Sequence, residues 1–273
     1  MSDMIITMPD GRELGVREWG VADGSPLFVC HGTPGSRYIR HVSGEYERLS
    51  IRAIAYDRPG YGRSTRVPTR ITADSAGDIE AIANRLGIAR FAVFGVSGGG
   101  PHALAAAALL SERVTRCATV VGIGPTRAED LDFLAGATEA ERDDTRRAMA
   151  DPVTFVEEVD FPVFQGIAAE GLHDASIGAA ELDMLREGVV EAIRQGPGGV
   201  VDDHVSAYAP WGFDLAAIRC PTRIMIAEED RLTAGHGVWL ARTIPPAELI
   251  RVPGGHLGPR QREEETLLAW LTR

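Results

Sequence analysis

Short apolar runs alternate with longer stretches of helical periodicity through the first half of the chain. Between Pro26 and about Gly122, the apolar runs PLFVC, RAIAY, RFAVFG and CATVVG are separated by such stretches. A strand that is apolar at nearly every position is buried on both faces, and its alternation with helices is typical of a parallel sheet covered by helices on both sides. The pattern predicts an α/β fold, with helices from the first run to Leu49, over 71–86 and from Gly98.

The two ends of the chain extend this predicted sheet. The segment ITMPDGRELGVREW indicates a β-hairpin with Asp10 and Gly11 at its turn, because Asp-Gly favours the tight turns of hairpins. This hairpin would add an antiparallel pair at one edge. Near the C-terminus, TRIMIA and AELIRV each predict a strand, with one helix near 236–242 and a last helix over 261–273.

The alternation stops after Gly124 and Pro125. From about Thr126 to Pro210 the sequence is helical and charged, without an obvious strand. We therefore expect a core domain over 1–125 and 211–273, interrupted by a helical cap, or lid, over 126–210.

Composition limits the kinds of partner and compartment. The chain has 273 residues and a net charge of −11, which argues against nucleic acid and anionic membranes, since both call for clustered basic residues. Three cysteines beside apolar runs indicate buried free thiols, and no pair has zinc-ligand spacing. The N-terminus lacks the features of a signal peptide and no apolar run is long enough to cross a membrane, so we expect a cytoplasmic protein.

The segment FGVSGGG joins an apolar strand to an alanine-rich helix and contains G-x-S-x-G at Gly95, Ser97 and Gly99. A nucleophile at a sharp strand-to-helix turn has a strained backbone, and Cβ atoms two residues to either side would collide. The helix that begins at Gly98 directs backbone N–H groups and its positive dipole end toward the serine, which favours an anion there. Ser97 is therefore the candidate nucleophile.

With this motif in this context, the chain resembles the α/β-hydrolase superfamily, of the esterase-like and haloperoxidase-like kind with a helical cap. The resemblance covers nearly the whole chain. HGTPG, at 31–35, lies where the family carries its second oxyanion donor, so the resemblance implies an oxyanion hole made by the backbone N–H groups of Thr33 and Gly98. His31 and, in DRPGYGRS, Asp57 and Arg58 are expected to have structural roles.

The family places its acid and its histidine after the nucleophile, in that order. After the strand TRIMIA, the sequence EED resembles the family's acid loop and implies Asp230 as the acid, with Glu229 as the alternative. The sequence departs from the family pattern at Ala227 and Ala234, where glycine and proline are usual. VPGGHLGP places His256 in the family's histidine loop, as the general base.

A serine nucleophile excludes the mechanism of the relatives that need a carboxylate at position 97, the haloalkane dehalogenases and epoxide hydrolases. The prediction is a serine hydrolase, carboxylesterase-like by default, that forms an acyl-enzyme intermediate. Thioesters, lactones, amides and carbon–carbon bonds beside a carbonyl fit the same scheme. Two other classes stay open: a lyase or cofactor-free oxygenase with His256 as base, and a small-molecule receptor.

The predicted partner is a small-molecule acyl substrate, with neither nucleic acid nor membrane, and a homodimer is left open. No cofactor and no metal are expected, because side chains and backbone N–H groups fill every proposed role. Four residues are candidates for substrate contact, one on the nucleophile's helix and three aromatic residues in or beside the cap: His102, Phe161, Phe164 and Trp211.

Overall fold

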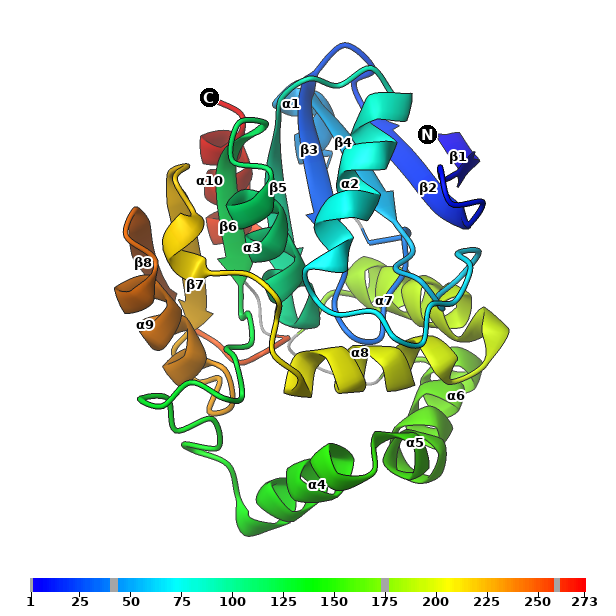
Figure 1. The fold of residues 1–273 in the computed structure, drawn as a ribbon, viewed down its shortest axis with the longest axis vertical. Coiled ribbons are helices and arrows are strands. Elements are labelled where there is room, and N and C mark those ends of the chain that lie inside the picture. The colour runs from blue at the N-terminus through cyan, green and yellow to red at the C-terminus, as the bar shows by residue number, and fades with distance from the viewer. Residues whose placement is uncertain (1, 40–43, 173–176, 258–260) are drawn as a thin grey trace.

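A mostly parallel sheet of eight strands forms the centre of the molecule in the computed structural model, which describes residues 2–39, 44–172, 177–257 and 261–273 (Figure 1). The strand order is β1-β2-β4-β3-β5-β6-β7-β8. The strands are β1 (Ser2–Thr7), β2 (Glu13–Gly20), β3 (Ser25–Cys30), β4 (Ile51–Tyr56), β5 (Phe91–Val96), β6 (Val114–Val120), β7 (Thr222–Ala227) and β8 (Ala247–Val252). The predicted α/β class is confirmed.

The N-terminal hairpin forms one edge of this sheet, as predicted. β1 pairs antiparallel with β2, with Ile6 opposite Leu14, and Gly11 in the turn has a φ of 86°. Glycine adopts this left-handed conformation without the steric cost that a Cβ brings. β2 then pairs antiparallel with β4, and the remaining neighbours are parallel.

Helices cover both faces of the sheet and divide the core into two apolar layers. The helices α2 (Asp74–Arg85), α3 (Gly100–Leu109) and α9 (Ala234–Thr243) pack on one face, and α1 (Glu45–Arg48) and α10 (Gln261–Leu271) pack on the other. The alanines of α3 are almost all fully buried, and small side chains let this helix approach β5 and β6 closely. The three cysteines are buried free thiols, as predicted.

The predicted helix between the first parallel strand and Leu49 is largely wrong. Residues 31–38 form a loop, and the described part of this segment becomes helical only at Glu45–Arg48. Gly32, Pro34 and Gly35 explain the difference, because proline lacks a backbone N–H and glycine disfavours helix.

Among the described residues between β6 and β7 there are five α-helices, which we call the helical insertion: α4 (Glu139–Ala150), α5 (Pro152–Phe155), α6 (Phe161–Glu170), α7 (Ala179–Ala192) and α8 (Gly198–Tyr208). Within the described part of this segment the structure has no strand. Figure 1 shows α7 and α8 across the carboxyl ends of the central strands, where α/β sheets bind ligands.

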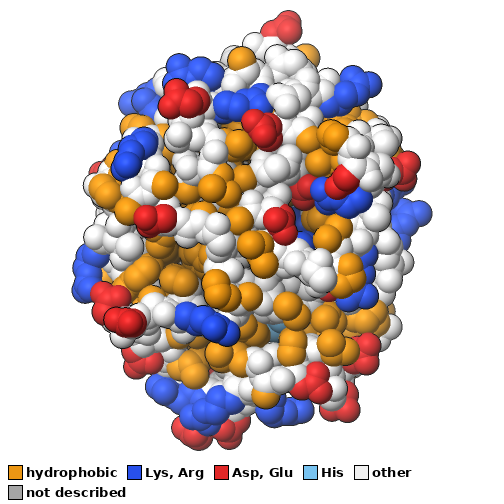
Figure 2. All heavy atoms as spheres, viewed as in Figure 1, with side chains coloured by type: hydrophobic (Ala, Val, Ile, Leu, Met, Phe, Trp, Pro, Cys, Tyr) orange, Lys and Arg blue, Asp and Glu red, His pale blue; other side chains and the backbone are white. Residues whose placement is uncertain are grey.

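The surface carries both signs of charge. Figure 2 shows acidic and basic side chains interspersed over one face, with hydrophobic side chains exposed between them. Among the described residues, none of the helices combines the length and the apolar character that crossing a bilayer requires.

Candidate active site

The candidate nucleophile lies on a strained turn between β5 and α3. Ser97 has a φ of 52°, in the left-handed region that residues with a Cβ rarely adopt. A Cβ at Gly95 would lie 2.2 Å from the carbonyl oxygen of Gly99, and a Cβ at Gly99 would lie 2.2 Å from that of Cys30. The backbone therefore closes around the serine only because both flanking residues are glycines, for the steric reason expected from the sequence.

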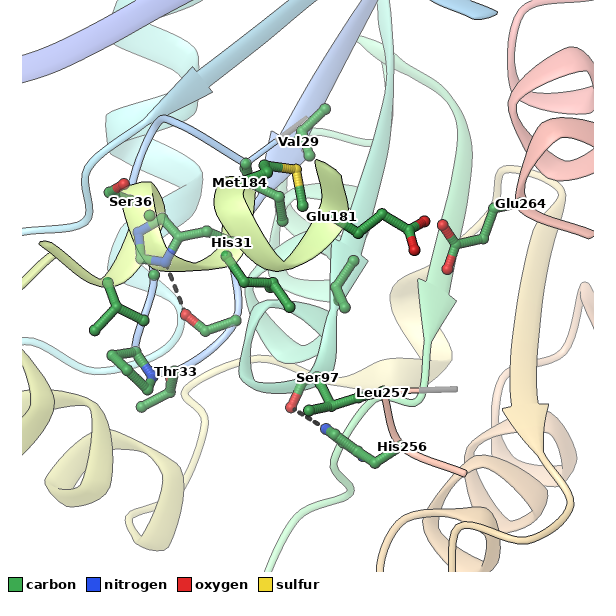
Figure 3. A pocket seen from close by; sticks show the side chains of 18 of the residues that line it. Val29, His31, Thr33, Ser36, Ser97, Glu181, Met184, His256, Leu257 and Glu264 are labelled. Carbon is green, nitrogen blue, oxygen red and sulfur yellow. Dashed lines mark hydrogen bonds between the residues drawn. The ribbon is translucent and has the colours of Figure 1, made fainter. Parts of the chain in front are cut away.

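The structure brings the three predicted triad side chains together. His256 Nε2 lies 3.0 Å from Ser97 Oγ (Figure 3), and His256 Nδ1 lies 2.7 Å from Asp230 Oδ2. The serine follows β5, the aspartate follows β7 and the histidine follows β8, so the sheet places all three at the carboxyl ends of its strands. An acceptor for the serine proton and an anion behind the imidazole are both within hydrogen-bonding distance.

The aspartate is itself held rigidly. Asp230 Oδ1 accepts hydrogen bonds from the backbone N–H groups of Leu232 at 3.1 Å and Thr233 at 3.2 Å, and the Thr233 hydroxyl donates to Oδ2. Burial acts to raise the pKa of Asp230, but the hydrogen bonds from His256 and Thr233 outweigh it and lower this pKa to about 2. The carboxylate is therefore ionised at neutral pH. The alternative acid, Glu229, is exposed, and its backbone N–H bonds to the carbonyl of Gly254.

The two predicted oxyanion donors lie close together beside the serine. A Cβ built on Gly98 would lie 3.3 Å from the backbone nitrogen of Thr33 and 2.5 Å from its Oγ1. Among the backbone–backbone hydrogen bonds of the described turns and loops, none is donated by the backbone N–H of Thr33. Thr33 and Ser97 line the same cavity.

A buried ion network supports the loop that carries Thr33. Arg58, fully buried, donates to the carbonyls of His31 and Gly32 and to the carboxylate of Asp203 on α8. The Thr33 hydroxyl also donates to Asp203, at 2.6 Å. Arg70 Nη2, at 2.6 Å, and the Tyr61 hydroxyl, at 2.8 Å, complete the set of donors to this carboxylate.

Asp203 was missed in the sequence. It lies 170 residues from Thr33 along the chain, inside a helix with no motif of its own. The structural role expected of Arg58 agrees with its position in this network. Burial acts to raise the pKa of Asp203, and Arg58 and Arg70 overcome this and hold it well below its usual value.

His31 and His102 are buried near the site and are neutral. Burial, reinforced by Arg58, lowers the pKa of His31 and of His102 well below the usual value. His31 Nδ1 lies 2.8 Å from the carbonyl of Gly32, and its Nε2 accepts from the backbone N–H of Arg58. His102 Nδ1 lies 3.1 Å from Ser75 Oγ. Both side chains are used in packing and hydrogen bonding.

A cavity of about 300 Å³ opens beside Ser97 and His256. Figure 3 shows these two residues at one end of it and Val29 and Met184 at the other, with the carboxylates of Glu181 and Glu264 pointing toward one another at one side. Much of the remaining wall is apolar and comes from β3, β5, α7 and the loops between: Val29, Ile39, Phe94, Val96, Leu185, Val189 and Leu257. Apolar walls with a few convergent polar groups are typical of small-molecule sites.

None of the four residues predicted to contact substrate lines this cavity. His102 is buried against Ser75 in the core, and Trp211 is buried with its ring stacked on Phe213, the centroids 5.8 Å apart. Phe161 and Phe164 lie on α6, which packs against α7. The wall is built by α7 instead, whose Met, Leu and Gly residues carry no signal that distinguishes them from an ordinary amphipathic helix.

Among the described residues, no three side chains of His, Cys, Asp or Glu lie together in a group that could hold a metal ion. The chemistry that the arrangement supports is nucleophilic attack by a serine.

Comparison with known proteins places this geometry in context. A family model described as alpha/beta hydrolase fold matches residues 25–259. A bifunctional esterase/perhydrolase from Acinetobacter calcoaceticus is 25% identical, over 96% of this chain and 95% of that protein. A proline iminopeptidase from Xylella fastidiosa (strain 9a5c) is 33% identical, but over 48% of this chain and 42% of the iminopeptidase, so the chain matches less than half of that relative. A solved thermophilic esterase from Thermogutta terrifontis shares the fold, with a TM-score of 0.68 and 23% identity over 99% of this chain and 97% of that one.

Proposed function

The chain belongs to the α/β-hydrolase fold family, and on that premise we propose that it is a serine hydrolase that cleaves carboxylic esters through an acyl-enzyme intermediate. The observation that carries the proposal is the continuous hydrogen-bonded path from Ser97 through His256 to Asp230, with distances of 3.0 and 2.7 Å. Ser97 and His256 line a cavity of about 300 Å³ with largely apolar walls, in which we place the substrate.

In the first half of the proposed reaction, His256 Nε2 accepts the proton of Ser97 as Oγ attacks the ester carbonyl carbon. Asp230 accepts a hydrogen bond from Nδ1, which keeps Nε2 free as the base and stabilises the imidazolium that forms. The negative charge on the carbonyl oxygen is stabilised by the backbone N–H groups of Thr33 and Gly98. His256 then returns the proton to the departing alcohol, which leaves the acyl group on Ser97.

In the second half, water takes the place of the alcohol. His256 accepts a proton from the water, which attacks the acyl carbon, and the same two backbone N–H groups stabilise the second tetrahedral intermediate. Collapse of this intermediate breaks the bond to Ser97 Oγ, returns the proton to the serine and releases the carboxylic acid. Every step uses side chains and backbone groups of this chain.

An ester is favoured over the other bonds that fit the scheme because of the relatives. The esterase/perhydrolase aligns with nearly the full chain, whereas the iminopeptidase aligns with less than half of it. Lactones, thioesters and compounds with a carbon–carbon bond beside a carbonyl fit the same mechanism and can be assayed in the same way. A lyase or cofactor-free oxygenase would use His256 as a base without an acyl-enzyme.

Labelling and turnover of matched proteins test the proposal. We expect a fluorophosphonate to label the wild-type chain and not Ser97→Ala, with the modified peptide containing position 97. Chromogenic acyl esters should be hydrolysed by the wild type and at least about 10⁴-fold more slowly by Ser97→Ala. Turnover that survives this substitution would instead indicate a lyase or an oxygenase.

A further inference from the structure

One face of α7 forms the side of the cavity that belongs to the helical insertion. Glu181, Met184, Leu185 and Gly188 line the cavity. They follow the spacing i, i+3, i+4 and i+7, which places four residues on one face of a helix. α7 therefore presents a continuous stripe to the space beside Ser97.

Gly188 is the exception in this stripe. It is buried, yet a Cβ built on it meets no heavy atom of the surrounding chain within 4 Å. A buried residue whose missing side chain would meet nothing faces a hollow, and the hollow at this position is the cavity that Gly188 lines. The space at Gly188 is thus open volume of the site.

Glycine at this position also works against the helix. Gly188 lies within α7, several residues from either end, where glycine is the poorest helix former after proline. The buried glycines around Ser97 are different, because a Cβ there would collide with backbone atoms. At Gly188 no such collision exists, so the local structure does not require glycine.

We propose that Gly188 determines the length of the acyl group that this enzyme accepts, and that its substrates are esters of apolar acids longer than acetate. The inference rests on the proposed ester hydrolysis at Ser97. The part of the wall that comes from the sheet is apolar, with Val29, Phe94 and Val96, so it favours a hydrocarbon chain.

The acyl group, and not the alcohol, is assigned to this cavity because of where His256 lies. His256 must protonate the departing alcohol, so the alcohol lies on the imidazole's side of Ser97. Figure 3 places His256 beside Ser97 at one end of the cavity and Met184 of α7 at the other end. The group that stays bonded to Ser97 Oγ is the one that can extend along this wall.

Two series of esters measure how Gly188 affects the choice of acyl group. One varies the acyl chain from acetyl to decanoyl on a constant p-nitrophenyl group, and the other varies the alcohol on a constant acetyl group. We expect Gly188→Leu to lower the ratio of kcat/KM for octanoyl to that for acetyl by about tenfold or more, since one misplaced methylene in an apolar pocket changes discrimination by about that factor. Met184→Ala, one turn earlier on the same face, should raise the same ratio.

Two further variants control for the helix and for folding. Gly166→Leu makes the same change in α6, at an exposed glycine that also has open space around its Cβ, and should leave the ratio unaltered. Gly188→Ala replaces glycine by the best helix former, so it should fold at least as well as the wild type and lower the ratio by less than Gly188→Leu. Circular dichroism verifies the fold of each variant.

Three results would overturn the inference. If the wild type hydrolyses esters and Ser97 is labelled, but the octanoyl-to-acetyl ratio is equal in wild type, Gly188→Ala and Gly188→Leu, the role of Gly188 fails alone. A change confined to the alcohol series would overturn the acyl assignment. Absence of both ester hydrolysis and Ser97 labelling would overturn the proposed function together with this inference.

Discussion

The carboxylate of Asp203 accepts a 2.6 Å hydrogen bond from the hydroxyl of Thr33, which joins α8 of the helical insertion to the loop beside the candidate nucleophile. The same carboxylate forms ion pairs with Arg58 and Arg70, and all three charged side chains are buried. A contact between the insertion and the core is therefore also the support of the predicted oxyanion loop.

Replacing this carboxylate should cost a large part of the stability. Asp203→Asn leaves Arg58 and Arg70 buried without a counter-charge, and we expect the free energy of unfolding in urea to fall by about 3–5 kcal/mol. Asp143→Asn is the matched control, because Asp143 is also an aspartate on a helix of the insertion and pairs with Arg146. Asp143 is exposed, so its substitution should change the free energy by about 0.5 kcal/mol or less. Equal effects of the two substitutions would contradict the role assigned to Asp203.

Removing the charge of the candidate acid should affect catalysis far more than substrate affinity. In Asp230→Asn the amide no longer fixes the hydrogen on Nδ1 of His256, and we expect kcat for ester hydrolysis to fall by about 10⁴-fold, as for the corresponding change in a serine protease triad. Glu229→Gln, at the exposed neighbouring residue, should change kcat little. Steady-state kinetics of both variants distinguishes the two candidate acids. A larger loss of kcat in Glu229→Gln than in Asp230→Asn would show that Glu229, and not Asp230, is the acid.

The turn at the nucleophile should tolerate no Cβ at Gly99. In Gly99→Ala the new atom would lie 2.2 Å from the carbonyl oxygen of Cys30, so the backbone must move, and we expect thermal unfolding to show a loss of about 3 kcal/mol. Gly77→Ala, on an exposed face of α2 with open space around the Cβ, should instead stabilise by about 0.5–1 kcal/mol. If both variants had the same melting temperature, the steric argument for the turn would fail.

Acid should destabilise the protein through carboxylates whose pKa is lowered by folding. Hydrogen bonds and arginines lower the pKa of Asp230 to about 2 and hold that of Asp203 well below its usual value, so both groups stabilise the fold when ionised. This contribution is complete above about pH 4, the unfolded value, and is lost as pH falls toward the folded values. Urea unfolding between pH 5 and pH 2 should show the decrease, with a shallower slope in Asp230→Asn than in the wild type.

Residues at strand ends were predictable from the sequence, and residues at helix contacts were not. Ser97, Asp230 and His256 each follow an apolar strand, and the periodicity predicted those strands. The resemblance to the α/β-hydrolase family then implied which residue after β7 is the acid and which residue after β8 is the base. The helical stretch predicted from the first apolar run to Leu49 is wrong over 31–38, where the glycines and the proline of HGTPG form a loop.

Asp203 and Gly188 depend on how α8 and α7 dock on the core, and local patterns do not encode that docking. Asp203 has an ordinary position in an amphipathic helix, and its partners are more than 130 residues away. The aromatic residues of α6 were chosen as substrate contacts for their chemistry alone, whereas the packing of α6 on α7 takes them away from the cavity. Tertiary packing decides which helix lines the cavity beside Ser97.

β6 and β7 are adjacent in the sheet, with Val120 opposite Met225, although the whole helical insertion lies between them in the chain. The insertion thus leaves and re-enters the core at neighbouring points, which makes it a natural unit for transplantation between related scaffolds. A chimaera that receives a foreign insertion would inherit the donor's choice of acyl chain with the recipient's chemistry. Such a graft must carry an acidic residue at the position of Asp203. Without it, Arg58 and Arg70 would be buried between the insertion and the core without a counter-ion.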